Sequence, residues 1–437
     1  LDHLNPRDFD PTAPQADLAV QADLRPAPGA KTFRVLGPVS VTNAKPGAID
    51  AGGLPVESLR TQVLLDATHQ ALTDIELKLV GGGRLTGSGE LRRERGGVSV
   101  AATTAPVASA AKGAKGANAA SAAKAAPPTS PDAEATVGGF ALTMRDLDLR
   151  ALYRKLPATT LGGPLDIKLD ATGQQIVLDW RDAARRVLAD IGLDAKGTTV
   201  NALSLEAGDR KVAATGVLEN DDAGAYRTQI KLTRFDPADW YDLYGPQKRG
   251  AKPPAASVTG QVDAQGALRP AFGLALKFAL QDSVYADLPM SGSGTVRLAG
   301  TRLLPSDANL LVAGNQVQLR GSFGTAGDKM AVKVDAPSLD KLGFGLAGRL
   351  QVDGQVSGTI ERPVVVATLA ADKLVFGAQK LQHLSGKVDV SGGLPGAAGD
   401  RLNVTLEGQG LTSDIARLDR LSLALAGTRG AHTLHLK

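Results

Sequence analysis

The 437-residue chain has no cysteine, few aromatic residues and only three methionines. The missing cysteines exclude disulfides, cysteine-ligated zinc, thiol catalysis and iron–sulfur clusters. Aromatic residues make up 4% of the chain, so Ala, Leu and Val supply nearly all of its apolar surface. Glycine is abundant by contrast, with 51 residues in the chain, well above the usual share of about 7%. This mixture is typical of many short strands joined by tight turns.

Targeting and membrane-spanning segments are also missing from the sequence. No basic and apolar leader opens the chain at Leu1, and no uncharged apolar run approaches the roughly 18 residues of a membrane helix. The best candidate, residues 271–280, contains Lys277. The chain stops within the strand-like alternation of residues 434–437, so we expect a segment of a longer protein. Any membrane anchor would then lie outside it.

Charged residues are spread along the chain. There are 49 basic and 45 acidic residues, and both signs alternate locally, as in residues 90–95. Nucleic-acid-binding proteins usually gather Lys and Arg on one face, so we expect a solvated surface and no nucleic-acid partner. The locally basic residues 180–186 could touch an anionic surface, although an exposed strand and turn is the simpler interpretation.

The sequence offers no clear set of catalytic residues. Among the five histidines only His432 and His435 are close, and at this spacing on a strand they point to opposite faces. The adjacent acids Asp221 and Asp222 fit a turn. Residues 343–348 match a dinucleotide-binding pattern by letter, but they lead into a strand, whereas that motif opens a helix. We therefore expect no enzyme activity, no metal site and no cofactor.

The dominant pattern is a period-two alternation of apolar and polar residues. Residues 75–79 read Ile-Glu-Leu-Lys-Leu, and residues 165–170 repeat the pattern. Each such run predicts a strand with one dry face and one wet face, and glycine-containing turns follow at about 8–12 residue intervals. The sequence thus predicts an all-β fold. The predicted dry-face residues are Ile75, Leu77, Leu79, Leu165, Ile167, Leu169, Ile230, Leu232, Val296, Leu298, Val317, Leu319, Leu350, Val352, Val404 and Leu406.

One stretch interrupts the strands. Residues 101–136 are almost wholly Ala, Lys, Gly, Ser, Thr and Pro, and cannot bury enough apolar surface to offset the entropy of ordering. We interpret them as a disordered insertion between β repeats at 1–100 and further β repeats at 137–437. A second, shorter flexible turn is predicted at 245–254.

A coarse repeat of short Asp, Leu and Pro-rich turns predicts one or two helical turns at each of residues 4–9, 147–152, 235–240 and 336–342. At the observed turn spacing the chain would hold roughly 35 strands, and a continuous sheet on the order of 150 Å long. A sheet of that size with one apolar face must fold over on itself. Its interior could then be filled by ligand or, as in an ordinary β-solenoid, by its own packed side chains.

The turn motifs resemble those of the bacterial TamB proteins of the AsmA-like group. The most characteristic part is residues 336–390, with Ala336-Pro337-x-Leu339-x-x-Leu342 at its start and Pro363-Val364-Val365-Val366 near its middle. The turns at 4–10 and 235–239 look like those of the same family. This resemblance implies a U-bent sheet, or β-taco, with an apolar inner groove, and a periplasmic protein anchored in the inner membrane by an N-terminal helix.

The resemblance also implies a function. Such proteins are thought to move phospholipids from the inner to the outer membrane, and to assist outer-membrane protein assembly with an Omp85-type barrel partner. The aliphatic, aromatic-poor dry face suits flexible acyl chains, because each buried methylene contributes about 0.8 kcal/mol. We therefore expect the sixteen dry-face residues to line a lipid groove. A scaffold or chaperone for outer-membrane proteins is the alternative, and regions outside this segment would dock the partner.

Overall fold

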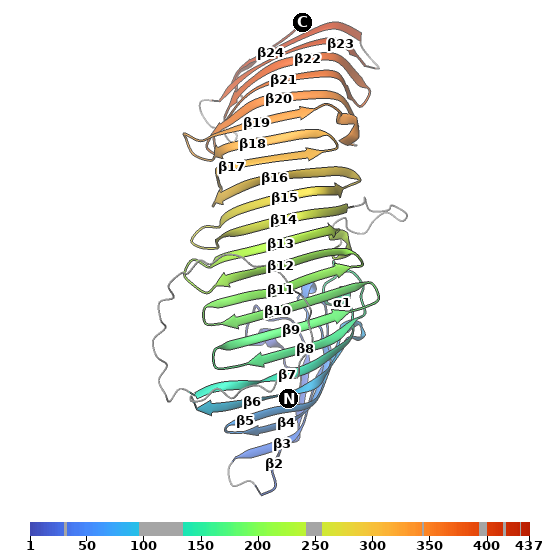
Figure 1. The fold of residues 1–437 in the computed structure, drawn as a ribbon, viewed down its shortest axis with the longest axis vertical. Helices are drawn as coiled ribbons and strands as arrows, with labels where there is room; N and C mark the ends of the chain where they lie inside the picture. The colour runs from blue at the N-terminus through green and yellow to red at the C-terminus, as the bar shows by residue number, and fades with distance from the viewer. Residues whose placement is uncertain are drawn as a thin grey trace, which may run out of the picture.

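The computed structural model describes residues 1–29, 33–95, 134–241, 256–342, 345–392, 400–413, 417–428 and 430–437. These residues form one open sheet of 25 strands. Strands β1 and β2 both pair with β3, and from β3 onward each strand pairs antiparallel with the next one in the chain. The strands therefore follow one another along the long axis of the molecule (Figure 1).

The first twelve strands are β1 (Leu18–Ala22), β2 (Arg25–Pro26), β3 (Arg34–Asn43), β4 (Val56–Asp66), β5 (His69–Leu79), β6 (Arg84–Arg95), β7 (Glu134–Leu147), β8 (Leu161–Leu169), β9 (Gly173–Arg181), β10 (Arg185–Asp194), β11 (Gly197–Ala207) and β12 (Arg210–Glu219). The others are β13 (Ala225–Phe235), β14 (Ala256–Ala267), β15 (Gly273–Tyr285), β16 (Leu288–Ala299), β17 (Arg302–Val312), β18 (Asn315–Phe323), β19 (Lys329–Ala336), β20 (Leu346–Gly358), β21 (Pro363–Phe376), β22 (Gln379–Ser391), β23 (Arg401–Thr412), β24 (Arg417–Gly427) and β25 (His432–Leu436). The helices are η1 (Pro6–Asp8), η2 (Ile49–Ala51), η3 (Val80–Gly82), α1 (Leu149–Leu152), η4 (Pro237–Asp239) and η5 (Leu339–Leu342).

The all-β prediction and the single continuous sheet are confirmed, but the predicted size is wrong. The structure has 25 strands where the turn spacing suggested about 35. Most strands are longer than the estimate assumed, with 13 residues in β20 and 14 in β21. At about 4.8 Å per strand the sheet is roughly 110 Å long.

The four predicted helical turns are confirmed as η1, α1, η4 and η5. Two further short helices, η2 and η3, were not predicted from the sequence. Strand β7 begins at Glu134, inside the predicted insertion, so the boundary at 136 is placed too late. The remaining residues of the insertion, 101–133, and the predicted turn at 245–254 lie outside the described residues.

The two long rims of the sheet carry different connections. Because the strands alternate in direction, every connection from an odd to an even strand after β3 lies at one rim, which we call the helix rim. The helices η2, η3, α1, η4 and η5 all belong to these connections. At the opposite rim, the loop rim, even strands lead into odd ones, and its described residues form no helix.

Several odd-numbered strands carry a bulge near the helix rim. Asp74, Asp146, Arg234, Asp282 and Lys373 all have positive φ, from 47° to 54°. The first four of them fall at breaks in the pairing register with the following strand. A bulge bends its strand and increases the local twist. The sheet is therefore bent repeatedly along one line, close to the helix rim.

The sheet is a single layer. Strands make their main contacts with their pairing partners, and no second sheet covers either face in the described part of the chain. The buried apolar residues of this part include one packed cluster, made of Leu79, Met144, Leu147 and Leu161 at the helix rim. The sheet is therefore not a β-solenoid with a packed interior.

Candidate functional site

One face of the sheet carries an unbroken row of apolar residues. The row begins at Ile75 on β5 and follows the register partner on each successive strand to Leu434 on β25, crossing 21 strands without a charged or polar side chain. At about 4.8 Å per strand the row is roughly 100 Å long. Its members are Ile75, Gly87, Leu142, Leu165, Leu178, Ala189, Leu203, Ala214, Ile230, Val262, Phe278, Gly294, Ala308, Leu319, Val332, Gly354, Ala367, Val388, Val404, Leu425 and Leu434.

All sixteen predicted dry-face residues lie on this apolar face, either in the row or two or four positions from it along a strand. Their surroundings differ. Leu79 is 8% exposed and belongs to the packed cluster at the helix rim, so it offers little surface to a ligand. Val317 and Leu319 are each 37% exposed, and the other residues, apart from the buried Ile75, are half-buried. Their role in binding lipid stays a prediction.

Alanine residues differ in solvent exposure between the two faces, and those compared on the apolar face are the more buried. Ala370 and Ala371 are consecutive in β21, yet Ala370 is exposed on the opposite face while Ala371 is 1% exposed on the apolar face. Similarly, Ala331 is exposed, whereas Ala336 on the apolar face is 2% exposed. Both buried alanines pair in register with Leu350 of β20, the strand that η5 contacts. The helix η5 therefore contributes to the burial of the apolar face at this end of the strands.

Glycines keep this face even in height. A Cβ atom at Gly89 would overlap the ring of Phe140 on the adjacent strand, and one at Gly386 would overlap the side chain of Leu406. At these two pairs the large side chain therefore occupies the space beside the glycine of the neighbouring strand. The abundance of glycine is visible in the sequence, but the pairing of a glycine with a large neighbour depends on the register between strands.

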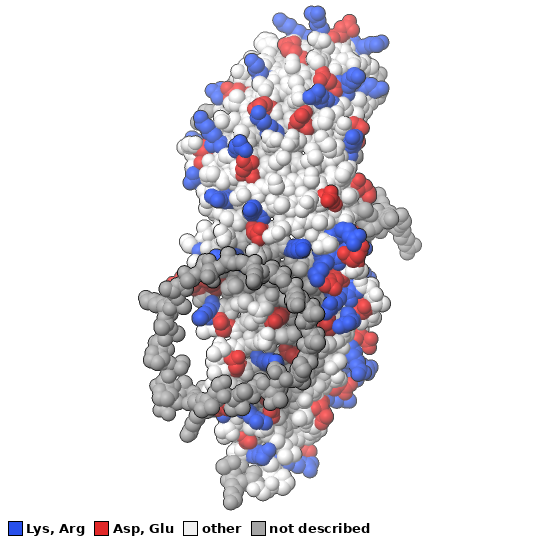
Figure 2. Space-filling model, in the orientation of Figure 1, with Lys and Arg blue, Asp and Glu red and all other residues white. Residues whose placement is uncertain are grey.

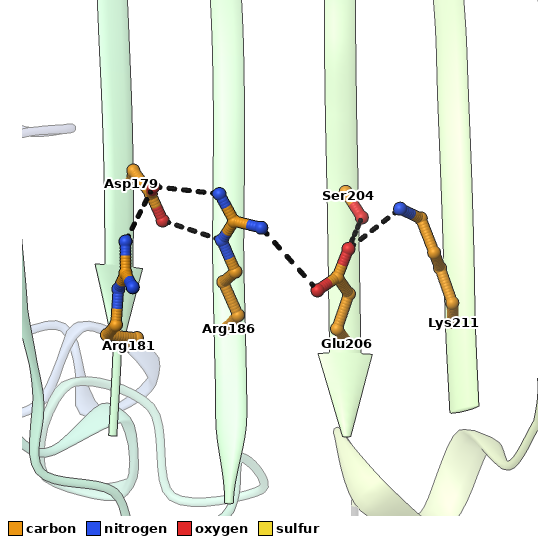
Figure 3. Close-up of polar contacts among 6 residues, drawn as sticks. All are labelled: Asp179, Arg181, Arg186, Ser204, Glu206 and Lys211. Atoms are coloured by element: carbon orange, nitrogen blue, oxygen red, sulfur yellow. Dashed lines mark hydrogen bonds and ion pairs between the residues drawn. The ribbon is translucent and has the colours of Figure 1, made fainter. Parts of the chain in front are cut away.

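The opposite, polar face is built from paired charges. Arg186 donates two hydrogen bonds of 2.8 Å to the carboxylate of Asp179, and Arg181 adds one of 3.0 Å (Figure 3). Lys211 donates to Glu206 at 2.7 Å. The hydrogen bond from Arg186 holds the pKa of Asp179 below its usual value, and Lys211 does the same for Glu206. Of the basic residues at 180–186, Arg181 and Arg186 are thus paired with an acidic neighbour within the sheet.

Hollows on the polar face are open and lined by such charges. One of about 450 Å³ spans β10 to β14, with Arg186, Glu206, Lys211 and Lys231 among its lining residues. Lysines, arginines and carboxylates are interspersed along the visible surface, with no large patch of one sign (Figure 2). The prediction of a solvated charged face fits this arrangement.

The weaker sequence motifs do not converge on a site. His432 pairs with Gly427 and His435 with Ala424, and the apolar row fixes their two positions on opposite faces, as predicted. Across the described residues no group of His, Cys, Asp or Glu could hold a metal ion. Asp221 accepts a hydrogen bond from the backbone of Ala225 in a turn, also as predicted. Residues 343 and 344 of the dinucleotide-like pattern lie outside the described residues.

The described residues contain no helix long and apolar enough to cross a membrane. Comparison with curated proteins gives no match, and comparison with solved structures gives none either. A family model described as the N-terminal domain of TamB matches residues 189–437, which is more than half of the chain. The matched region begins within β10 and includes the characteristic motifs at 336–390. The chain therefore belongs to the TamB family.

Proposed function

We propose that the apolar face carries the acyl chains of phospholipids, and that the chain is a non-catalytic segment of a lipid conduit between two membranes. The observation that carries this proposal is the apolar row, which crosses 21 strands from Ile75 to Leu434 without a polar interruption. An ordinary core of this length would be covered by a second layer, because large exposed apolar surfaces favour association. The described sheet has no such cover.

Burial on this face is strong enough to hold a lipid. Each fully buried methylene contributes about 0.8 kcal/mol, so half-burying about ten methylenes in each of two tails stabilises the complex by about 8 kcal/mol before ordering costs. Pairs such as Phe140 with Gly89 support movement, because a large side chain that fills the space beside a glycine obstructs the face less. Tails could then slide between equivalent positions along the row.

Membership of the TamB family supports the setting of this proposal. We propose a periplasmic location, within a protein anchored in the inner membrane, and a role in outer-membrane biogenesis. An Omp85-type outer-membrane barrel is the proposed protein partner, docked through regions outside this chain. The second candidate function is a scaffold for outer-membrane protein assembly, in which the same face would hold extended polypeptide.

Photo-crosslinking from matched neighbours tests the proposal. A photoreactive amino acid is placed at Ile167 or at Leu319 on the apolar face. The control for Ile167 is the next residue, Lys168, and the control for Leu319 is the preceding residue, Gln318, both on the polar face. We expect phospholipid adducts at least several-fold more frequent at Ile167 and Leu319. Equal lipid labelling of the two faces contradicts the conduit. Protein adducts in place of lipid at Leu319 would favour the scaffold.

A further inference from the structure

The two rims of the apolar face differ in how they are sealed. At the helix rim, Leu149 and Leu152 of α1 pack on the cluster of Leu79, Met144, Leu147 and Leu161. Leu161 is 0% and Leu147 is 2% exposed. Farther along the same rim, Trp240 after η4 is 8% exposed and Leu339 of η5 is 5% exposed. At α1, at η5 and directly after η4, apolar side chains are thus packed against the strand ends.

Polar anchors hold these helices to neighbouring turns. Asn315, which is 5% exposed, donates from Nδ2 to the carbonyl of Ser338 at 3.0 Å and accepts from the amide of Ser338 at 3.1 Å. Arg185 donates to the carbonyl of Asp239 in η4 at 3.2 Å. The hydroxyl of Thr159 donates to the carbonyl of Leu147 at 2.8 Å, beside α1. The helix rim is therefore a fastened wall at α1, η4 and η5.

Between β10 and β15 the residues at the loop rim are more exposed. Leu193 and Leu218, on the apolar face at the ends of β10 and β12, are 36% and 41% exposed. In the turn between β14 and β15, Leu268 and Phe272 are 48% and 46% exposed. Phe272 stacks on Tyr226 with ring centroids 6.3 Å apart, at the border of the apolar face. Charged residues of both signs lie at the strand ends and in the turns, among them Lys196, Glu219, Asp222 and Arg269.

This asymmetry orients a bound amphiphile. A charged headgroup must stay in water or be paired, because burying an unpaired charge costs far more than the tails contribute. The helix rim would place the headgroup against fastened apolar residues. We propose that, from β10 to β15, phospholipid headgroups project at the loop rim, and that lipids enter or leave the face sideways there. This inference rests on the proposed lipid-carrying function and adds to it the direction in which the lipid faces.

Strand β10 offers a matched test. Ala184 and Ala195 are exposed and flank β10 at the helix rim and the loop rim, respectively, while Ile191 lies on its apolar face. The three positions receive the same photoreactive amino acid in separate full-length chains. Each chain is loaded with two phosphatidylethanolamine probes, one tagged in its headgroup and one tagged at the end of an acyl tail. After crosslinking, the lipid is cleaved so that only the crosslinked part stays on the protein. The tag that remains there shows whether the headgroup or the tail was crosslinked.

We expect the tail tag at Ile191, and the headgroup tag at least five-fold more often at Ala195 than at Ala184. Tail labelling at Ile191 with headgroup labelling equal at the two alanines, or greater at Ala184, overturns the inference and leaves the proposed function intact. If the tail tag is not found at Ile191, both this inference and the proposed lipid-carrying function are contradicted. Ala184 and Ala195 are solvent-exposed positions in the turns on either side of β10, so substitutions there should leave the fold intact. The melting temperature of each chain checks this, and a chain with a lowered value is misfolded.

Discussion

The ring of Phe140 on β7 lies over Gly89 of β6, its register partner, in the space where a side chain at position 89 would begin. Both residues are on the apolar face, two positions from the continuous row. The contact shows how a large side chain is accommodated on a crowded face. Its neighbour contributes no side chain, so the ring lies flat.

The substitution Gly89→Ala is expected to destabilise the fold by about 1–3 kcal/mol, because the added methyl overlaps the Phe140 ring and overpacks the face. Gly327→Ala is the matched control, since a Cβ at Gly327 meets no atom within 4 Å. Thermal unfolding followed by circular dichroism measures both. Equal melting temperatures for the two variants would contradict the packing described at Gly89.

Closure of the helix rim predicts a large difference between two leucines. Leu161→Ala should cost about 2–5 kcal/mol, because Leu161 is 0% exposed and its loss leaves a cavity beneath α1. Leu218→Ala at the loop rim should cost much less, since Leu218 is 41% exposed. Denaturant unfolding, with limited proteolysis near 149–161 as a second readout, compares them. The closed rim is contradicted if Leu218→Ala is the more damaging change.

The turn between β18 and β19 predicts a pH-dependent contribution to stability. Asp328 accepts hydrogen bonds from Arg302 at 2.9 and 3.0 Å, and others from Ser322 and Thr325. The hydrogen bond from Arg302 is the main cause of the low pKa of Asp328. A lowered pKa in the folded state stabilises the protein above the unfolded value of about 4, and the benefit is lost as the pH falls below it.

Asp328→Asn should therefore lower the melting temperature most at pH 7. The difference in melting temperature between the variant and the unchanged protein should shrink as the pH falls from about 5 toward 2. Asp307→Asn, in an exposed pair with Arg320, is the control and should change little at any pH. Thermal melts across this range give both curves. A gap for Asp328→Asn that stays constant with pH would show that the carboxylate charge is not responsible.

A charge on the apolar row should exclude lipid. Leu319→Glu places a carboxylate where an acyl chain would remove it from water, whereas Gln318→Glu places the same group on the polar face. Leu319 is 37% exposed, so the folded sheet tolerates the charge. We expect at least a several-fold loss of co-purifying phospholipid, measured by mass spectrometry, for Leu319→Glu alone. Equal lipid content in the two variants would contradict lipid binding on this face.

Local pattern was sufficient for much of the fold. Alternation in runs such as 165–170 and 404–407 identified strands and their dry sides, and the Asp, Leu and Pro-rich turns identified four of the six helices. Strand number was overestimated, because turn spacing does not reveal how long each strand remains paired. The bulge at Asp74 was also invisible, since its effect is a register shift against β6.

The residues of the candidate site were predictable as a set, but their individual environments were not. Leu79 and Leu319 occupy equivalent positions in the alternation, yet Leu79 is buried in the cluster beside α1 and Leu319 is exposed to solvent. The cluster residues Leu147 and Leu161 were missed, because they lie at strand ends beside a helix and lack a clear alternation. Only the packing of α1 distinguishes them.

The sequence by itself determined the strands and their two faces, because side chains alternate with a period of two and apolar residues avoid water. That is why Ile75 on β5 and Leu434 on β25, the two ends of a row across 21 strands, lie on the same face. The tertiary structure alone decided that no second sheet covers this face in the described residues, that α1, η4 and η5 cover parts of one rim, and that the other rim is exposed between β10 and β15. These features depend on register, bulges and contacts between distant residues, which no local pattern specifies.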